Sequence, residues 1–126
     1  MLKNIVIAVL VLCLAGICIF QGWYITDVFT DLENITEDLK LEAEAGNYQA
    51  ALGVYEKLMR RWDKHLTVLS IFLIHDEVDN VSEELENIGA QLREENELLL
   101  PSSIARLTYY LGHIRDGDAF CVENIF

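Results

Sequence analysis

Residues 5–20 read IVIAVLVLCLAGICIF, and this apolar run contains no polar side chain. One cationic residue, Lys3, precedes the run, and every aspartate and glutamate of the chain follows it. A surface helix of a soluble protein keeps a polar face, whereas a helix that is apolar all round belongs in a protein core or a bilayer. The run therefore predicts a helix whose surroundings differ from those of the acidic remainder.

The residues after the run favour a permanent anchor over a cleaved signal. A signal peptide ends in small residues at its cleavage site, but the bulky pair Trp23-Tyr24 stands here. A lipoprotein signal needs a small residue before its modified cysteine, and Ile17 fills that position before Cys18. Neither kind of processing site is therefore present in the expected form.

Counted through Ile25, the run approaches the roughly 20 residues that a spanning helix needs. Its aromatic border is typical of side chains that meet lipid headgroups. We predict a transmembrane anchor over residues 1–25 that contacts the membrane through residues 5–25. A cleaved, secreted helical protein and a buried core helix of a soluble protein are the alternatives.

Charge predicts the orientation of this anchor. Lys3 and the amino terminus flank the run on one side, and Asp27, Asp31 and Glu33 follow it on the other. Positive flanks favour the cytoplasmic side of a membrane. We predict a single-pass protein of the cell membrane, with a cytoplasmic N-terminus and an extracytoplasmic domain over residues 26–126.

The composition of the chain limits the kinds of partner that it can bind. The 126 residues carry a formal net charge of −12, and eight of the nine basic residues follow the anchor with all 21 acidic ones. The remaining length suits one small domain. Because a surface of this sign repels a phosphate backbone, we expect no nucleic-acid partner.

The extracytoplasmic part predicts an all-α fold, because its apolar residues recur at three- and four-residue steps and show no strand-like alternation. We expect helices over about 27–45, 47–97 and 101–116, the first of which continues directly from the membrane. Gly46-Asn47 tolerates the left-handed conformation that ends helices, so the next helix returns antiparallel. The anchor is thus followed by a helical hairpin or three-helix bundle. The first and last of these helices carry the apolar stripes Val28, Leu32, Ile35, Leu39 and Ala43, and Ile104, Leu107, Leu111 and Ile114.

Two apolar stripes share residues 47–97, and they face nearly opposite sides of a helix, about 200° apart. Where they overlap, Leu66 to Ile74 is apolar almost all round, which predicts burial on both sides. Either one long helix changes partners there, or the chain kinks near residues 70–78. No Gly or Pro occurs in that window, which favours the continuous helix. The stripes are Tyr48, Leu52, Tyr55, Met59, Trp62, Leu66, Leu69 and Leu73, then Ile71, Ile74, Val78, Val81, Leu85, Ile88 and Leu92.

A basic patch is the first candidate contact surface. It consists of Lys57, Arg60, Arg61 and Lys64, on the helix that packs against the acidic helix over 27–45. Charge compensation across this hairpin is the interpretation we favour. Docking of an acidic partner is the other.

A polar cluster, in which residues 74–80 read IHDEVDN, is the second candidate. His75 and Asp79 stand four residues apart, at metal-ligand spacing on one helix face. The zinc-protease pattern would need a second histidine at Asp79, and an EF-hand loop would need a glycine. A hydrogen-bond network between His75 and a neighbouring helix is therefore preferred to a metal site, and we expect no metal and no cofactor. Asp76 and Asn80 complete this candidate interaction surface.

The C-terminal segment, residues 119–126, is too apolar for a free tail. We expect it to pack on the bundle, and an exposed Phe126 would instead bind a partner. No phosphate-binding glycine loop, nucleophile elbow or Cys/His pairing occurs in the sequence. We therefore predict no enzyme activity.

Two resemblances rest on particular stretches. Residues 46–52 read GNYQAAL and, with Tyr55 and Leu58, resemble half of a tetratricopeptide repeat, too little for an array. The anchor, the acidic helix, the turn at Gly46, Trp62, the cluster over 74–80 and the closing ENIF together resemble the domain of unknown function family 4363. This resemblance implies a small membrane-anchored helical protein of Clostridia or Bacilli, and it supplies no activity.

Two classes of function follow from these features. The favoured hypothesis is a non-enzymatic scaffold or accessory subunit that binds another membrane or envelope protein. The alternative is an envelope sensor or a ligand- or metal-binding module that uses His75, Asp76 and Asp79.

Overall fold

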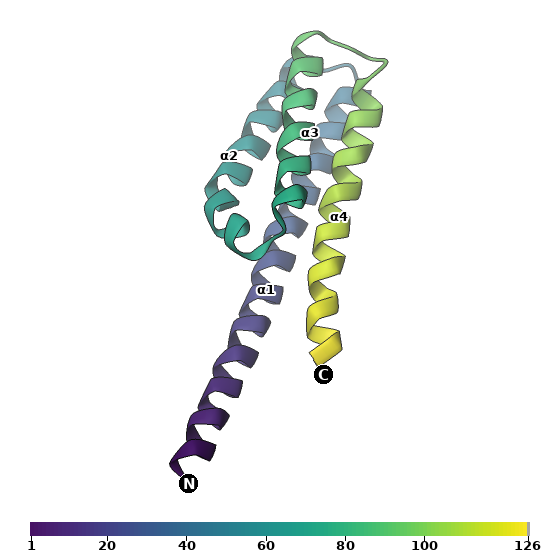
Figure 1. The fold of residues 1–126 in the computed structure, drawn as a ribbon. Coiled ribbons are helices and arrows are strands. Elements are labelled where there is room, and N and C mark those ends of the chain that lie inside the picture. The colour runs from purple at the N-terminus through teal and green to yellow at the C-terminus, as the bar shows by residue number, and fades with distance from the viewer. Residues whose placement is uncertain (126) are drawn as a thin grey trace.

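The computed structural model describes the backbone of residues 1–125 and the side chains of residues 1–117. Within that range the chain forms four helices and no strand (Figure 1). The expected all-α class is confirmed, with a long apolar N-terminal helix followed by a helical bundle. The helices are α1 (Leu2–Glu44), α2 (Tyr48–Phe72), α3 (His75–Arg93) and α4 (Leu100–Ile125).

Helix α1 carries the apolar run and the first predicted domain helix without a break. It is 43 residues long. Its N-terminal part is long and apolar enough to cross a membrane, and none of that apolar window is buried. Leu12, for example, is 72% exposed, and the described part of the chain leaves the side chains of this window uncovered. This exposure argues against the core helix of a soluble protein, whose apolar side chains would be covered.

The turn between α1 and α2 forms where Gly46-Asn47 predicted it. Gly46 has φ +77°, the left-handed conformation that costs glycine least. Its N–H donates to the carbonyl of Ala43 at 3.1 Å, and the N–H of Asn47 donates to that of Glu42 at 3.0 Å. This pair of bonds is a Schellman motif, which satisfies the last carbonyls of α1 and reverses the chain.

The preference for one continuous helix over residues 47–97 is wrong. Helix α2 ends at Phe72, and Leu73 takes an extended conformation with φ −101° and ψ 157° before α3 begins at His75. A straight helix would leave one of the two stripes without a partner, because they face opposite sides. Reversal of the chain at Leu73-Ile74 turns both stripes toward one core, apart from Ile71 and Ile74, so burial of apolar area outweighs the missing break signal.

The break makes the bundle one of four helices instead of three. Each helix packs against two neighbours, in the circular order α1, α2, α3, α4 (Figure 1). The first four members of the α1 stripe and all members of the α4 stripe are buried as predicted. The α2 stripe is rotated, since Ala51 and Leu58 are fully buried while Leu52 and Met59 are only half-buried. Burial on both sides of Leu66–Ile74 is also wrong, because Ile71 and Ile74 are 74% and 67% exposed.

Candidate functional site

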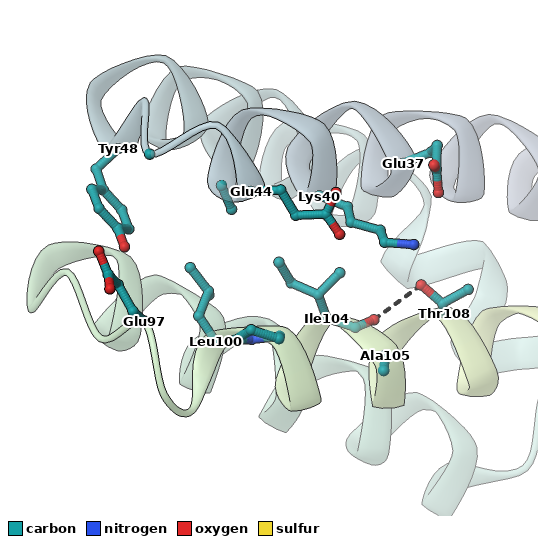
Figure 2. Close-up of a pocket in the computed structure, with 12 residues that line it drawn as sticks. Glu37, Lys40, Glu44, Tyr48, Glu97, Leu100, Ile104, Ala105 and Thr108 are labelled. Atoms are coloured by element: carbon teal, nitrogen blue, oxygen red, sulfur yellow. Dashed lines mark hydrogen bonds between the residues drawn. The ribbon is translucent and has the colours of Figure 1, made fainter.

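A cleft lies between α1 and α4, and Figure 2 shows the residues that line it. It lies at the end of the bundle away from the apolar run. We call it the distal cleft, and its volume is about 530 Å³, within the range typical of ligand sites. Both helices contribute because α1 ends and α4 begins at this end of the bundle. The lining residues are Glu37, Lys40, Ala43, Glu44, Gly46, Tyr48, Glu97, Leu100, Pro101, Ile104, Ala105 and Thr108.

The two walls of the distal cleft differ in character. The α4 wall is apolar and is built on Leu100 and Ile104, which are also core residues. The α1 wall is charged, with Glu37, Lys40 and Glu44 at steps of three and four along one face (Figure 2). A ligand held here would meet an apolar surface on one side and carboxylates on the other.

Tyr48 and Glu97 close the distal cleft at the α1–α2 turn, where the phenol oxygen points to the carboxylate (Figure 2). Burial raises the pKa of the Tyr48 phenol, and the negative charge of Glu97 raises it further. Thr108 donates its hydroxyl proton to the Ile104 carbonyl at 2.9 Å, so this proton is held within α4. The described lining contains no histidine, cysteine or serine. The arrangement suits binding of a cationic, partly apolar group.

The four residues of the basic patch differ in their roles: one forms an ion pair within the bundle, and three are exposed. Arg61 forms an ion pair with Asp31 of α1 at 2.5 Å, which is charge compensation across the hairpin. Lys57, Arg60 and Lys64 are exposed, and no ion pair of theirs is found within residues 1–117. The patch lies on α2 and contributes nothing to the distal cleft.

Two further interhelical ion pairs involve residues that the sequence did not single out. Arg115 of α4 contacts Glu33 of α1 at 2.5 Å, and Arg106 of α4 contacts the buried Glu84 of α3 at 3.3 Å. Burial raises the pKa of Glu33, while the nearby Arg115 guanidinium opposes that rise. The acidic face of α1 is thus partly an interface and not only a solvated surface.

The polar cluster over residues 74–80 does not contribute to the distal cleft. His75, Asp76, Asp79 and Asn80 are exposed around the first turns of α3. The expected network from His75 to another helix is absent from the described residues, because the break at Leu73-Ile74 puts His75 at the end of the bundle. The same part of the chain holds no group of three or more His, Cys, Asp or Glu side chains placed for a metal ion.

The interhelical histidine is His65 instead. Its Nδ1 lies 2.7 Å from the Tyr24 hydroxyl of α1, and the two rings meet edge to face. Burial lowers the pKa of His65, and the positive charges of Lys64 and Arg61 act in the same direction against Asp31 and Asp27. In the neutral imidazole Nδ1 accepts the phenol proton. This contact ties α2 to α1 at the border of the apolar run.

We expect this pair to make the bundle less stable in mild acid. Because the pKa of folded His65 lies below its usual value of about 6.5, the unfolded chain takes up a proton first, and stability is lost as the pH falls from there through the folded pKa. Thermal unfolding of the full chain in zwitterionic micelles between pH 7.5 and 5 measures this slope. His65→Gln should flatten it, and His113→Gln, at an exposed position of α4, should not. An unaltered slope in His65→Gln would contradict the assignment.

Phe126 and residues 119–125, which the sequence predicts to pack on the bundle, lie outside the described side chains. The distal cleft was not predicted. Its charged wall has a sequence signal in the spacing of Glu37, Lys40 and Glu44, but such spacing usually marks a solvated face. Only the position of α4 turns that face into one side of a cleft.

Comparison with known proteins identifies the family. The family described as Domain of unknown function (DUF4363) matches residues 19–125. The chain therefore belongs to this family, as its resemblance predicted. The match covers the end of the apolar run and the whole bundle, including both walls of the distal cleft. No curated protein and no solved structure matches the chain.

Proposed function

We propose that this family member is a single-pass membrane protein that acts as a non-enzymatic scaffold or accessory subunit. Residues 5–25 of α1 span the membrane, with the N-terminus in the cytoplasm and the bundle outside. The distal cleft holds a positively charged, partly apolar segment of another envelope protein. The observation that carries this proposal is the continuity of α1, which forms both the apolar run and the charged wall of the distal cleft.

The packing around residues 22–25 supports an anchor that is retained. Gly22 and Ile25 are buried against the bundle, and the Tyr24 hydroxyl forms a hydrogen bond with His65. Cleavage near the end of the apolar run would remove these contacts and expose the α2 surface that they cover. The retained helix also fixes the distance of the distal cleft from the membrane. Glu44 lies 24 residues beyond Phe20, which is about 36 Å along α1.

The chemistry of the distal cleft indicates the class of partner. Pro101 and Ala105 of α4 offer exposed apolar surface. Among the described lining residues, the carboxylates of Glu37, Glu44 and Glu97 outnumber the single cation, Lys40. A lysine or arginine side chain matches both, since its methylene stem lies on apolar surface while its charged head seeks carboxylates. The strong negative charge of the whole bundle speeds encounter with such a partner.

A defined probe tests this assignment. We expect a short helical peptide of leucine and lysine to shift the backbone amide resonances of Ala105 and Thr108, with the full chain in zwitterionic nanodiscs. A peptide of leucine and glutamate should leave them unchanged. In the double variant Glu44→Lys and Glu97→Lys the affinity for the cationic peptide should fall about tenfold, equivalent to about 1.4 kcal/mol.

The variant also controls for binding of the peptide to lipid, which it does not alter. Equal shifts with both peptides, or equal affinity in the variant, would contradict the proposed cleft chemistry. In native membranes, a photoreactive side chain at Ala105 should cross-link a discrete partner, while one at Ala90, exposed on α3, should not. The same cross-linked species from both positions would argue against the distal cleft as the docking site.

A further inference from the structure

The connection between α2 and α3 carries uncovered apolar side chains. Val68, Ile71 and Ile74 are 37%, 74% and 67% exposed, and we call them the proximal apolar patch. Their neighbours Phe72 and Leu73 pack against the core. The backbone here is held by hydrogen bonds from Leu73 N–H to the Leu69 carbonyl and from Glu77 N–H to the Ile74 carbonyl. The patch is therefore presented by ordered backbone and is not a loose loop.

Along the axis of α1, the patch lies level with the end of the apolar run. Helix α2 runs antiparallel to α1, with Trp62 against Phe29 and, one turn later, His65 against Tyr24. Ile71 follows His65 by six residues, which carries it about 9 Å further toward the apolar part of α1. Figure 1 shows the α2–α3 connection at the end of the bundle that faces the N-terminal half of α1.

We propose that the proximal apolar patch inserts into the headgroup–acyl boundary of the same membrane that α1 spans. This inference rests on the proposed function, in which the aromatic border of α1 marks the membrane surface. Apolar side chains of interfacial elements reach about 5–10 Å into that boundary, which matches the position of Ile71 beyond Tyr24. The bilayer then covers the two isoleucines, which no side chain among residues 1–117 buries.

The charges around the patch indicate the kind of lipid surface. Asp76 and Glu77 stand in the first turn of α3, directly after Ile74. These carboxylates disfavour anionic headgroups, so insertion is driven by apolar burial and suits zwitterionic lipid. Two attachment points, α1 and the patch, set the tilt and rotation of the bundle. They hold the distal cleft in one orientation relative to the membrane.

Site-directed fluorescence tests the insertion with the full chain in zwitterionic liposomes. The native cysteines are replaced by alanine, and an environment-sensitive fluorophore is attached at Ile71→Cys or Ile74→Cys. We expect at least a twofold loss of fluorescence when lipids with a nitroxide near the headgroup are included. Leu41→Cys, also exposed but at the far end of α1, should lose none. Leu12→Cys, which lies near the middle of the apolar run, reports whether α1 itself spans, and it is tested with lipids that carry the nitroxide deep in the acyl chain.

Each outcome separates the two proposals. Quenching at Leu12 and at both isoleucine positions supports insertion of the patch. Quenching at Leu12 without quenching at Ile71 and Ile74 overturns the patch proposal and leaves the spanning helix standing. A bright but unquenched probe at Ile74 means that protein covers the patch, which also overturns the proposal. Absence of quenching at all positions overturns the spanning helix and, with it, the inference.

Discussion

Replacement of Trp62 by alanine should cost the bundle about 3–5 kcal/mol of unfolding free energy, the usual penalty for removing a large aromatic side chain from a core. Trp62 is 2% exposed and is among the largest fully buried side chains of the described core. Its ring meets Phe29 of α1 edge to face at 6.4 Å, and its Nε1 donates to Ser82 Oγ of α3 at 3.0 Å. One side chain thus joins three helices.

Denaturant unfolding of the full chain in micelles, followed by far-ultraviolet circular dichroism, measures this loss. Trp23→Ala is the matched control, because Trp23 lies on the same chain but is 66% exposed on α1. We expect the control to leave the unfolding free energy of the bundle within about 0.5 kcal/mol of the wild type. A loss below about 1 kcal/mol in Trp62→Ala would mean that the three helices do not meet at this side chain.

Gly89→Ala should destabilise the bundle by about 1–2 kcal/mol, even though alanine is the better helix former. A Cβ at Gly89 of α3 would lie 2.7 Å from Cζ and 3.0 Å from Cε1 of Tyr55 of α2. The phenol ring would have to move, and overpacking of this kind costs about 1–3 kcal/mol. The gain in helix propensity, about 0.5–1 kcal/mol, offsets only part of that cost.

Gly53→Ala, on the neighbouring helix α2, should change the stability of the bundle in the opposite direction. Gly53 is exposed in α2, and a Cβ there would meet no heavy atom within 4 Å. We expect it to stabilise the bundle by about 0.5–1 kcal/mol. Thermal unfolding of both variants under one set of conditions checks the pair. A gain in stability from both substitutions would show that α2 and α3 are further apart than the contact between Gly89 and Tyr55 requires.

The spacing of apolar residues predicted burial best in the helices that carry a single apolar stripe. The stripes of α1 and α4 met this condition, so Leu32 and Leu107 are buried as expected. The chain reversal at Leu73-Ile74 did not follow from local signals, since neither Gly nor Pro occurs there. The phase difference between the two stripes was the only indication, and it fitted a continuous helix equally well.

The candidate site was predicted less well than the fold. Of the proposed contact residues, Arg61 is used in an ion pair within the hairpin, and His75 and Asp79 are exposed at the opposite end from the distal cleft. The cleft combines residues of α1 with residues that lie more than fifty positions later in the chain. No local spacing encodes such a pairing, because it depends on the order in which the helices pack.

The sequence by itself determined that one N-terminal helix is long and apolar enough to span a membrane, that the remainder is acidic and all-α, and that Gly46 reverses the chain. Composition, periodicity and a left-handed glycine act over a few residues, so they can be recognised locally. The continuation of the apolar run into the first domain helix was also predicted from the sequence. Only the tertiary structure decided that the chain reverses at Leu73-Ile74, that α4 forms a cleft with α1, and that Ile71 and Ile74 are exposed. These features depend on contacts between distant segments, where burial of the whole core outweighs local preference.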